Sequence, residues 1–222
     1  MPAFSHSTRL GTATVLLMLL GSYVFTSSAD AAEGDISRIN EGITVDAEQR
    51  VGDVSSVNGG IRLGRAASAD EVTTVNGSIE LDDGVVVTEA HTVNGGIRLG
   101  SDVTVNGELS TVNGGIRINA GSVVERNVET VNGRVVLESA TIRQDIVTAN
   151  GDIEIVDGAT VEGDVRVEGK RRWWDRLFSW NNRPPRITVD AESSILGDIH
   201  LYREVRLEIE DGATVGEVIE HF

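Results

Sequence analysis

The feature that most constrains the fold of this chain is a tripeptide, Val-Asn-Gly or a close variant, that recurs at a nearly constant interval. Its asparagines are separated by 18, 18, 19, 19 and 18 residues, and one further step of 18 towards the N-terminus reaches another asparagine. The seven are Asn40, Asn58, Asn76, Asn94, Asn113, Asn132 and Asn150. A fixed period of this length is typical of repeat proteins, in which each repeat packs on the next.

A shorter period of six residues runs inside each repeat. Counted from Ile39, almost every sixth residue is apolar, provided that the count is moved by one residue where a repeat is one residue longer. We predict that these residues face inward: Ile39, Val45, Val51, Val57, Leu63, Ala69, Val75, Leu81, Val87, Val93, Leu99, Val105, Val112, Ile118, Val124, Val131, Leu137, Ala149, Ile155, Val161 and Val167. A second inward residue precedes many of these by two: Ile61, Ile79, Val85, Ile97, Val103, Ile116, Val135, Ile153 and Val165. Each unit therefore reads as a short strand followed by a corner.

Three such strands complete one repeat, which predicts an all-β fold, a three-sided parallel β-helix of about 18 residues per coil. We expect about nine coils, seven of them within residues 32–169 and the last ones within residues 187–222. Parallel strands of successive coils would lie about 4.8 Å apart. Asn-Gly is also a strong hairpin signal, so an antiparallel barrel is the rival fold, but a constant period fits a barrel poorly.

The corners have a composition that suits sharp turns. We expect the Asn-Gly pairs at one corner in a left-handed backbone conformation, with the seven asparagines hydrogen-bonded to one another as a structural ladder. We predict that the residue immediately before each Val-Asn-Gly tripeptide points outward. These residues would form a row that faces solvent on one side of the solenoid. That row consists of Ser56, Thr74, Thr92, Thr111, Thr130 and Thr148.

The N-terminal segment predicts export. Arg9 is followed by an apolar stretch from Leu10 to Phe25 and by the small residues Ala29-Asp30-Ala31. This order is typical of a signal peptide over residues 1–31, cleaved after Ala31, and it predicts a periplasmic or extracellular protein. The alternative is a retained membrane anchor, for which the apolar stretch is short.

A segment from residue 170 to residue 186 interrupts the repeat and differs from it in composition. It contains six basic residues, one acidic residue and all three tryptophans, whereas the whole chain carries a net charge of −16. Its candidate contact residues are Arg171, Arg172, Trp173, Trp174, Arg176, Leu177, Phe178 and Trp180. Such a loop suits a membrane surface, an anionic glycan or a partner protein. The alternative is a loop that folds back on the acidic wall of the solenoid.

No catalytic residue, metal site or cofactor is predicted from the sequence. The chain has no cysteine, and no motif for a nucleophile, a metal or a phosphate is present. His91 falls at a predicted inward position, and His200 and His221 have no clustered partner in the sequence. The acidic composition argues against nucleic acid as a partner.

The runs VSSVNGGIRLG, HTVNGGIRLG and VDGATVEGDVRVEG resemble the bactofilins, bacterial β-helices that polymerise end to end without nucleotide, and also exported adhesin-like β-solenoids. The resemblance covers about residues 36–222 outside the interruption and implies head-to-tail assembly. Bactofilins typically lie in the cytoplasm or on the cytoplasmic side of the membrane. The signal peptide predicted here differs from that pattern.

The end coils predict the same behaviour, because the sequence shows no polar capping unit at either end, and bare coil ends invite another chain. We therefore expect a non-enzymatic structural or adhesin-like solenoid of the cell envelope that forms homo-oligomers. A monomeric glycan- or envelope-polymer-binding module is the alternative, and a β-helix enzyme is a third.

Overall fold

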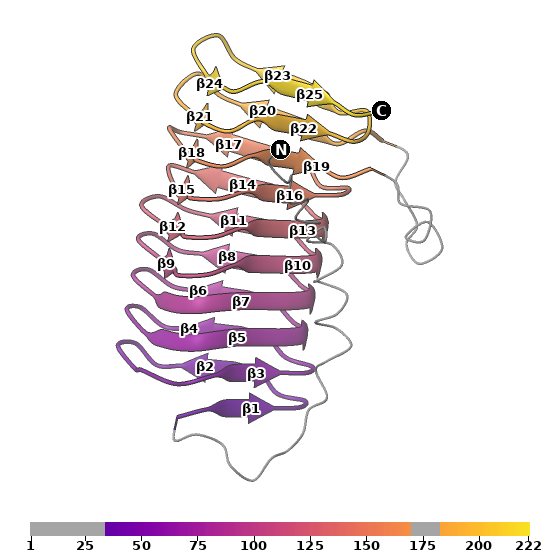
Figure 1. Ribbon diagram of the computed structural model, residues 1–222. Coiled ribbons are helices and arrows are strands. Elements are labelled where there is room, and N and C mark those ends of the chain that lie inside the picture. Colours follow the sequence, from indigo (N-terminus) through magenta and orange to yellow (C-terminus); the bar gives the residue numbers. More distant parts are fainter. Residues whose placement is uncertain (1–33, 170–182) are drawn as a thin grey trace, which may run out of the picture. The chain divides into compact units, whose positions relative to one another are not determined.

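The computed structural model describes residues 34–169 and 183–222, which form a parallel β-solenoid of about nine coils (Figure 1). Within those ranges there is no helix, and so none long and apolar enough to cross a bilayer. Every pair of neighbouring strands is parallel and joins one coil to the next, for example β4 to β6 and β6 to β8. The predicted fold class is confirmed, and the antiparallel barrel is wrong.

Each coil has three sides, which we number in the order in which the chain reaches them. Side 1 holds β1(Ile36–Arg38), β3(Val54–Ser56), the second halves of β5(Ser68–Asn76) and β7(Val86–Asn94), β10(Leu109–Asn113), β13(Val128–Asn132), β16(Ile146–Thr148), β19(Val165–Val167), β22(Ile199–Leu201) and β25(Val218–Glu220). Side 2 holds β2(Ile43–Val45), β4(Ile61–Leu63), β6(Ile79–Leu81), β8(Ile97–Leu99), β11(Ile116–Ile118), β14(Val135–Glu138), β17(Ile153–Val156), β20(Arg186–Val189) and β23(Arg206–Ile209). Side 3 holds the first halves of β5 and β7, and β9(Thr104–Val105), β12(Val123–Val124), β15(Thr141–Ile142), β18(Thr160–Val161), β21(Ser194–Ile195) and β24(Thr214–Val215).

The length of a coil varies slightly along the solenoid. Aligned strands are offset by 18 residues in the first coils, as between Ile43 and Ile61, and by 20 on side 2 of the last coil, as between Ile187 and Leu207. Across the interruption the offset is 34 residues, as between Ile153 and Ile187. The first extra residue enters at the corner between sides 3 and 1, because Val86 aligns with Thr104 but Ala90 aligns with Leu109. A corner can absorb an added residue without changing the register of the strands.

Sides 2 and 3 bury the apolar residues that the sequence predicts. Ile61 and Leu63 on side 2 and Val87 and Val105 on side 3 are at most 1% exposed, and their equivalents in every other coil except the last are buried as well. Stacked along the axis, these side chains form one continuous core. Removal of this apolar surface from water is the main force that stabilises the solenoid.

On side 1 most of the predicted inward positions are wrong by one residue, although Val165 and Val167 are buried as predicted. Ser56, Thr74, Thr92, Thr111, Thr130 and Thr148, predicted to face solvent, are all at most 4% exposed. The residues after them are the predicted inward set: Val57, Val75, Val93, Val131 and Ala149 are only half-buried, Val112 is 5% exposed, and Ile39 is 66% exposed. The two inward residues of a strand on this side are therefore the one that carries the hydroxyl and the one two positions before it, as with Ser56 and Val54.

The buried hydroxyl groups explain this shift, because each one hydrogen-bonds to the adjacent corner. Thr74 Oγ1 donates to the carbonyl of Gly59, Thr92 to that of Gly77 and Thr111 to that of Gly95, each at 2.9 Å. Ser56 and Thr130 make the equivalent bond. A buried hydroxyl is tolerated when it has such a partner.

The corner between sides 1 and 2 carries the asparagines, and their side chains form a continuous ladder. From Asn58 to Asn150, each Nδ2 donates to the Oδ1 of the asparagine one coil earlier, at 2.8–3.0 Å. The ladder ends at Arg203, whose Nη1 donates to Asn150 Oδ1 at 2.6 Å and to Ala149 O at 3.1 Å.

The predicted left-handed backbone is at a different corner. No asparagine of the ladder, and no glycine that follows one, has a positive φ. Positive φ values occur at the corner between sides 2 and 3, for example at Ala66, Gly84 and Asp102. The ladder glycines are needed for another reason: a Cβ on any of them would overlap backbone of the coil before, as with Gly133 against the carbonyl of Gly114.

Candidate functional site

The last coil differs from those before it in the exposure of its inward side chains. Leu207, Ile209 and Val215 are only half-buried, whereas their aligned counterparts one coil earlier are fully buried. Val218 aligns with the fully buried Ile199 but is itself 38% exposed. β23, β24 and β25 are the outermost strands of their sheets, so in the described chain their outer edges are unpaired (Figure 1). We call this surface the open coil.

Beside the open coil, the corner between sides 3 and 1 carries a column of stacked carboxylates. Asp145, Asp164 and Asp198 occupy successive coils, and each accepts the backbone N–H of the next member: Asp164, Asp198 and finally Glu217, at 2.9–3.0 Å. The short aspartate side chain reaches the next coil because coils are only one strand spacing apart. These hydrogen bonds fix the orientation of the carboxylates.

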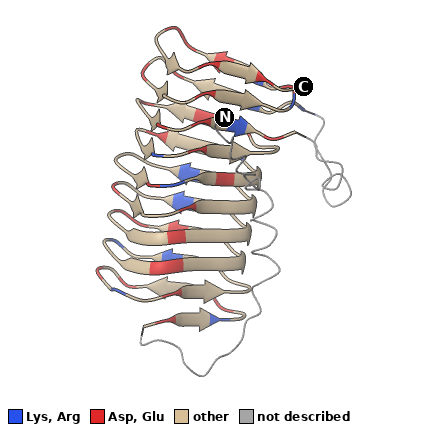
Figure 2. Ribbon diagram, in the orientation of Figure 1, with Lys and Arg blue, Asp and Glu red and all other residues tan. Residues whose placement is uncertain are grey.

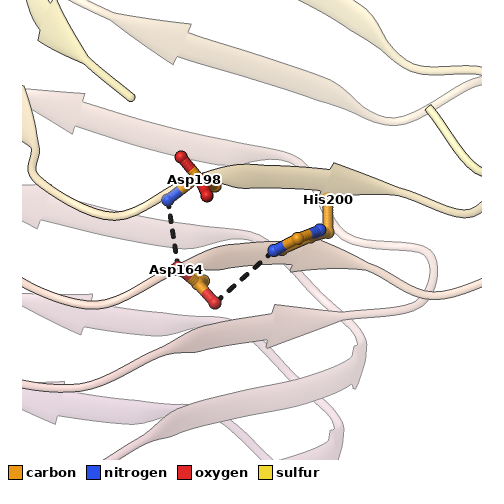
Figure 3. A group of neighbouring side chains, drawn as sticks. All are labelled: Asp164, Asp198 and His200. Atoms are coloured by element: carbon orange, nitrogen blue, oxygen red, sulfur yellow. Dashed lines mark hydrogen bonds and ion pairs between the residues drawn. The ribbon is translucent and has the colours of Figure 1, made fainter. Parts of the chain in front are cut away.

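Next to this column, His200 on β22 lies among polar groups on the outer wall. Its Nε2 is 3.5 Å from Asp164 Oδ2 (Figure 3), and its Nδ1 is 3.2 Å from Nε2 of His221. The ring of His221 stacks on Tyr202, with centroids 4.3 Å apart and planes at 9°. The prediction that His200 and His221 have no clustered partner is therefore wrong.

Arg166 on β19 contributes the positive charge of this cluster. Its Nη2 lies 2.7 Å from Asp164 Oδ2 and 3.2 Å from Asp145 Oδ2. Partial burial opposes ionisation of Asp164, but the hydrogen bonds from Arg166 and from Asp198 N–H outweigh it, so its pKa lies below the ordinary value. One guanidinium thus contacts two of the three stacked carboxylates, those of Asp145 and Asp164.

A second polar cluster lies on side 1 in the middle of the solenoid. His91 points outward, contrary to the prediction, and its ring nitrogens lie 2.7 Å from Ser110 Oγ and 3.2 Å from Glu89 Oε2. These residue types suggest a catalytic triad, but Ser110 is only 1% exposed, so a substrate cannot reach its hydroxyl in this structure. Burial, together with neighbouring carboxylates, raises the pKa of Glu108 and of Glu129 to about 7.

Side 2 has a shallow groove of 460 Å³ that arginines and carboxylates line together. Arg62 lies between Glu80 and Asp82, and Arg98 also contacts Glu80. Charged residues of both signs lie along this wall (Figure 2), although Arg98 on β8 aligns with Arg117 on β11, which has the same charge. The groove therefore lacks the excess of positive charge that would attract an anionic polymer.

The predicted contact residues of the interruption, from Arg171 to Trp180, lie outside the described residues. Where the chain is described again, Arg183 contacts Asp152, and Arg186 donates its backbone N–H to Asp152 Oδ1 at 2.9 Å and lies 3.5 Å from Glu208. The second end of the interruption is thus held against acidic residues of the wall.

The His200 cluster could not be found by motif, since its members come from three coils and the interruption separates Asp164 from Asp198. The one signal in the sequence was the six-residue period. If the count is resumed after residues 170–186, it places Asp164 and Asp198 at the same corner of successive coils. Comparisons with family models, with curated proteins and with solved structures gave no match.

Proposed function

We propose that this chain is a non-enzymatic structural solenoid of the cell envelope that associates end to end through the open coil. The observation that carries the proposal is the exposure of Leu207, Ile209, Val215 and Val218 at a coil end whose strand edges are unpaired in the described chain. Half-exposed apolar residues beside free strand edges favour pairing with another chain. The resemblance to bactofilins and adhesin-like solenoids agrees with this proposal.

The occupant that we propose for the open coil is the first coil of a second copy. Both coils have the same three-sided outline, so β1 and β2 of one copy can extend the sheets that end at β25 and β23 of another. Charge favours this arrangement over contact between two open coils. Residues 34–51 hold four acidic and two basic residues, whereas residues 206–222 hold five acidic and one basic. Because both ends remain acidic, salt should strengthen the association.

Substitution of Val218 by lysine tests the association. Val218→Lys places a charge on the open coil, so we expect it to abolish concentration-dependent sedimentation, while the parent chain forms larger species as concentration rises and more so at about 500 mM than at about 50 mM salt. Leu196→Lys is the matched control, because Leu196 is 60% exposed one coil earlier, away from the edge. A parent chain that stays monomeric at all concentrations, or equal effects of the two lysines, would contradict the proposal.

We further propose that the interruption docks the solenoid on an anionic surface, either a membrane or an envelope glycan. Its tryptophans and arginines are the residue types that such surfaces bind. We expect a chain with Trp173, Trp174 and Trp180 changed to alanine to lose retention on anionic vesicles or on anionic glycan, while its unfolding curve is unchanged. Unchanged retention on both would leave the segment with a structural role only. Retention on glycan by a strictly monomeric chain would favour the alternative function, a monomeric polymer-binding module.

A further inference from the structure

The polar cluster beside the open coil brings together side chains suited to binding a metal ion. One ligand atom from each of Asp164, Asp198 and His200 lies within 4.8 Å of the other two (Figure 3). In Figure 3, the Nε2 of His200 points towards the two carboxylates. The Nε2–Oδ2 separation of 3.5 Å between His200 and Asp164 is close to the spacing of two ligands on one ion, since bonds of about 2.0–2.2 Å place tetrahedral ligands about 3.4 Å apart.

The other ring nitrogen of His200 has the partner that a metal-binding histidine needs. Its Nδ1 lies 3.2 Å from His221 Nε2, and Tyr202 stacks on His221 and holds that ring in place. When Nδ1–H of His200 donates to His221, the lone pair of Nε2 faces two carboxylates. An outer hydrogen bond of this kind orients the ligating imidazole in metal sites.

The charges around this position match those of a divalent cation. Asp145, Asp164 and Asp198 carry three negative charges, and Arg166 neutralises one of them. Arg166 contacts Asp145 and Asp164, whereas the Oδ1 of Asp198 accepts the Glu217 N–H and its other oxygen remains for a ligand. The three carboxylates and the guanidinium together leave an excess of two negative charges.

The geometry points to a binding site for one divalent transition-metal ion, such as zinc or manganese, with Asp164, Asp198 and His200 as ligands and His221 as the residue that positions His200. Mixed imidazole and carboxylate ligands favour these ions over calcium, which prefers an all-oxygen shell. Since Asp164 precedes the interruption and the other two ligands follow it, the ion would fasten together the coils on either side of residues 170–182. This inference does not rest on the proposed self-association.

The test is titration of the metal-free full chain, without a histidine tag, with zinc chloride and with manganese chloride in a calorimeter. We expect one ion per chain, and a loss of affinity of about tenfold or more in His200→Gln, Asp164→Asn and Asp198→Asn. His221→Gln should weaken binding by a smaller factor, because it only positions His200. His91→Gln is the matched control, because His91 lies on the same side of the solenoid and also contacts a carboxylate. The metal affinity of this variant should equal that of the parent.

Arg166 separates a metal site from an ordinary ion-pair network. Arg166→Gln removes the cation that competes for Asp164, so we expect it to tighten zinc binding by about threefold or more, although it removes two ion pairs. Bound metal should also raise the midpoint of thermal unfolding of the parent and not of His200→Gln. No saturable binding of either ion, equal affinity in His200→Gln and the parent, or weaker binding in Arg166→Gln would overturn the proposal.

Discussion

Replacement of Gly133 by alanine should prevent the solenoid from folding or should lower its free energy of unfolding by more than about 4 kcal/mol. A Cβ at this position would overlap the carbonyl group of Gly114 in the preceding coil, and neither atom can move without separating two coils. Separation would lengthen the asparagine hydrogen bond from Asn132 to Asn113, now 3.0 Å, and would open the core between the coils. Circular dichroism and urea unfolding measure the loss.

Gly84→Ala is the matched control for this change. Gly84 has a φ of +69°, but a Cβ there meets nothing closer than 3.9 Å. The aligned corner positions of the neighbouring coils hold Ala66 and Asp102 at φ values of 55° and 57°, so a side chain is tolerated at this corner. We expect a cost of about 1–2 kcal/mol from the left-handed conformation alone. Equal losses in the two variants would mean that the close approach of backbones is not what requires the ladder glycines.

Glu129→Gln should stabilise the protein above neutral pH. Glu129 is 4% exposed, and burial first, then the charges of Asp145 and Glu168, raise the pKa of its carboxyl group from 4.5 to about 7 despite the hydrogen bond from Asn127. Because the folded chain holds this proton more tightly than the unfolded chain, the stabilisation is fully present below a pH of about 4.5 and is lost as pH rises through about 7. The loss amounts to at most about 3 kcal/mol.

Urea unfolding at about pH 5 and about pH 8 measures this effect. Glutamine cannot ionise, so the variant should be more stable than the parent at the higher pH and should depend less on pH. Part of the pH dependence of stability should remain in Glu129→Gln, because the pKa of Glu108 is also raised to about 7. Glu210→Gln, at an exposed glutamate, serves as the control and should leave the pH dependence unchanged. A pH dependence in Glu129→Gln identical to that of the parent would contradict the account.

The period of the sequence predicted the fold because the apolar residues of two sides repeat in a fixed register. Leu63 and Val87 are buried as expected, since each lies in a strand of side 2 or side 3, where the six-residue count holds. On side 1 the counting failed at Ser56 and Val57, because the chain bends there and the apolar residue belongs to the corner. The carbonyl that accepts the Ser56 hydroxyl, that of Glu41, lies 15 residues earlier, and only the stacked coils bring it close.

The candidate metal ligands show the same limit more strongly. Aspartates at the corner before side 1 could be read from the repeat, but their contact with His200 depends on how residues 170–186 interrupt the count. His221 follows the last strand, where the six-residue pattern no longer fixes the direction of a side chain. Prediction from sequence thus succeeds for the strands of sides 2 and 3, and it fails at the end of side 1 and for contacts that cross the interruption or the coil end.

Electron microscopy of the purified chain, across a range of concentrations and salt, tests the central claim of end-to-end association most directly. The account predicts unbranched fibres of uniform width that lengthen with concentration, and single short rods for Val218→Lys. Isolated rods of the parent chain under every condition, or fibres that persist in Val218→Lys, would contradict it.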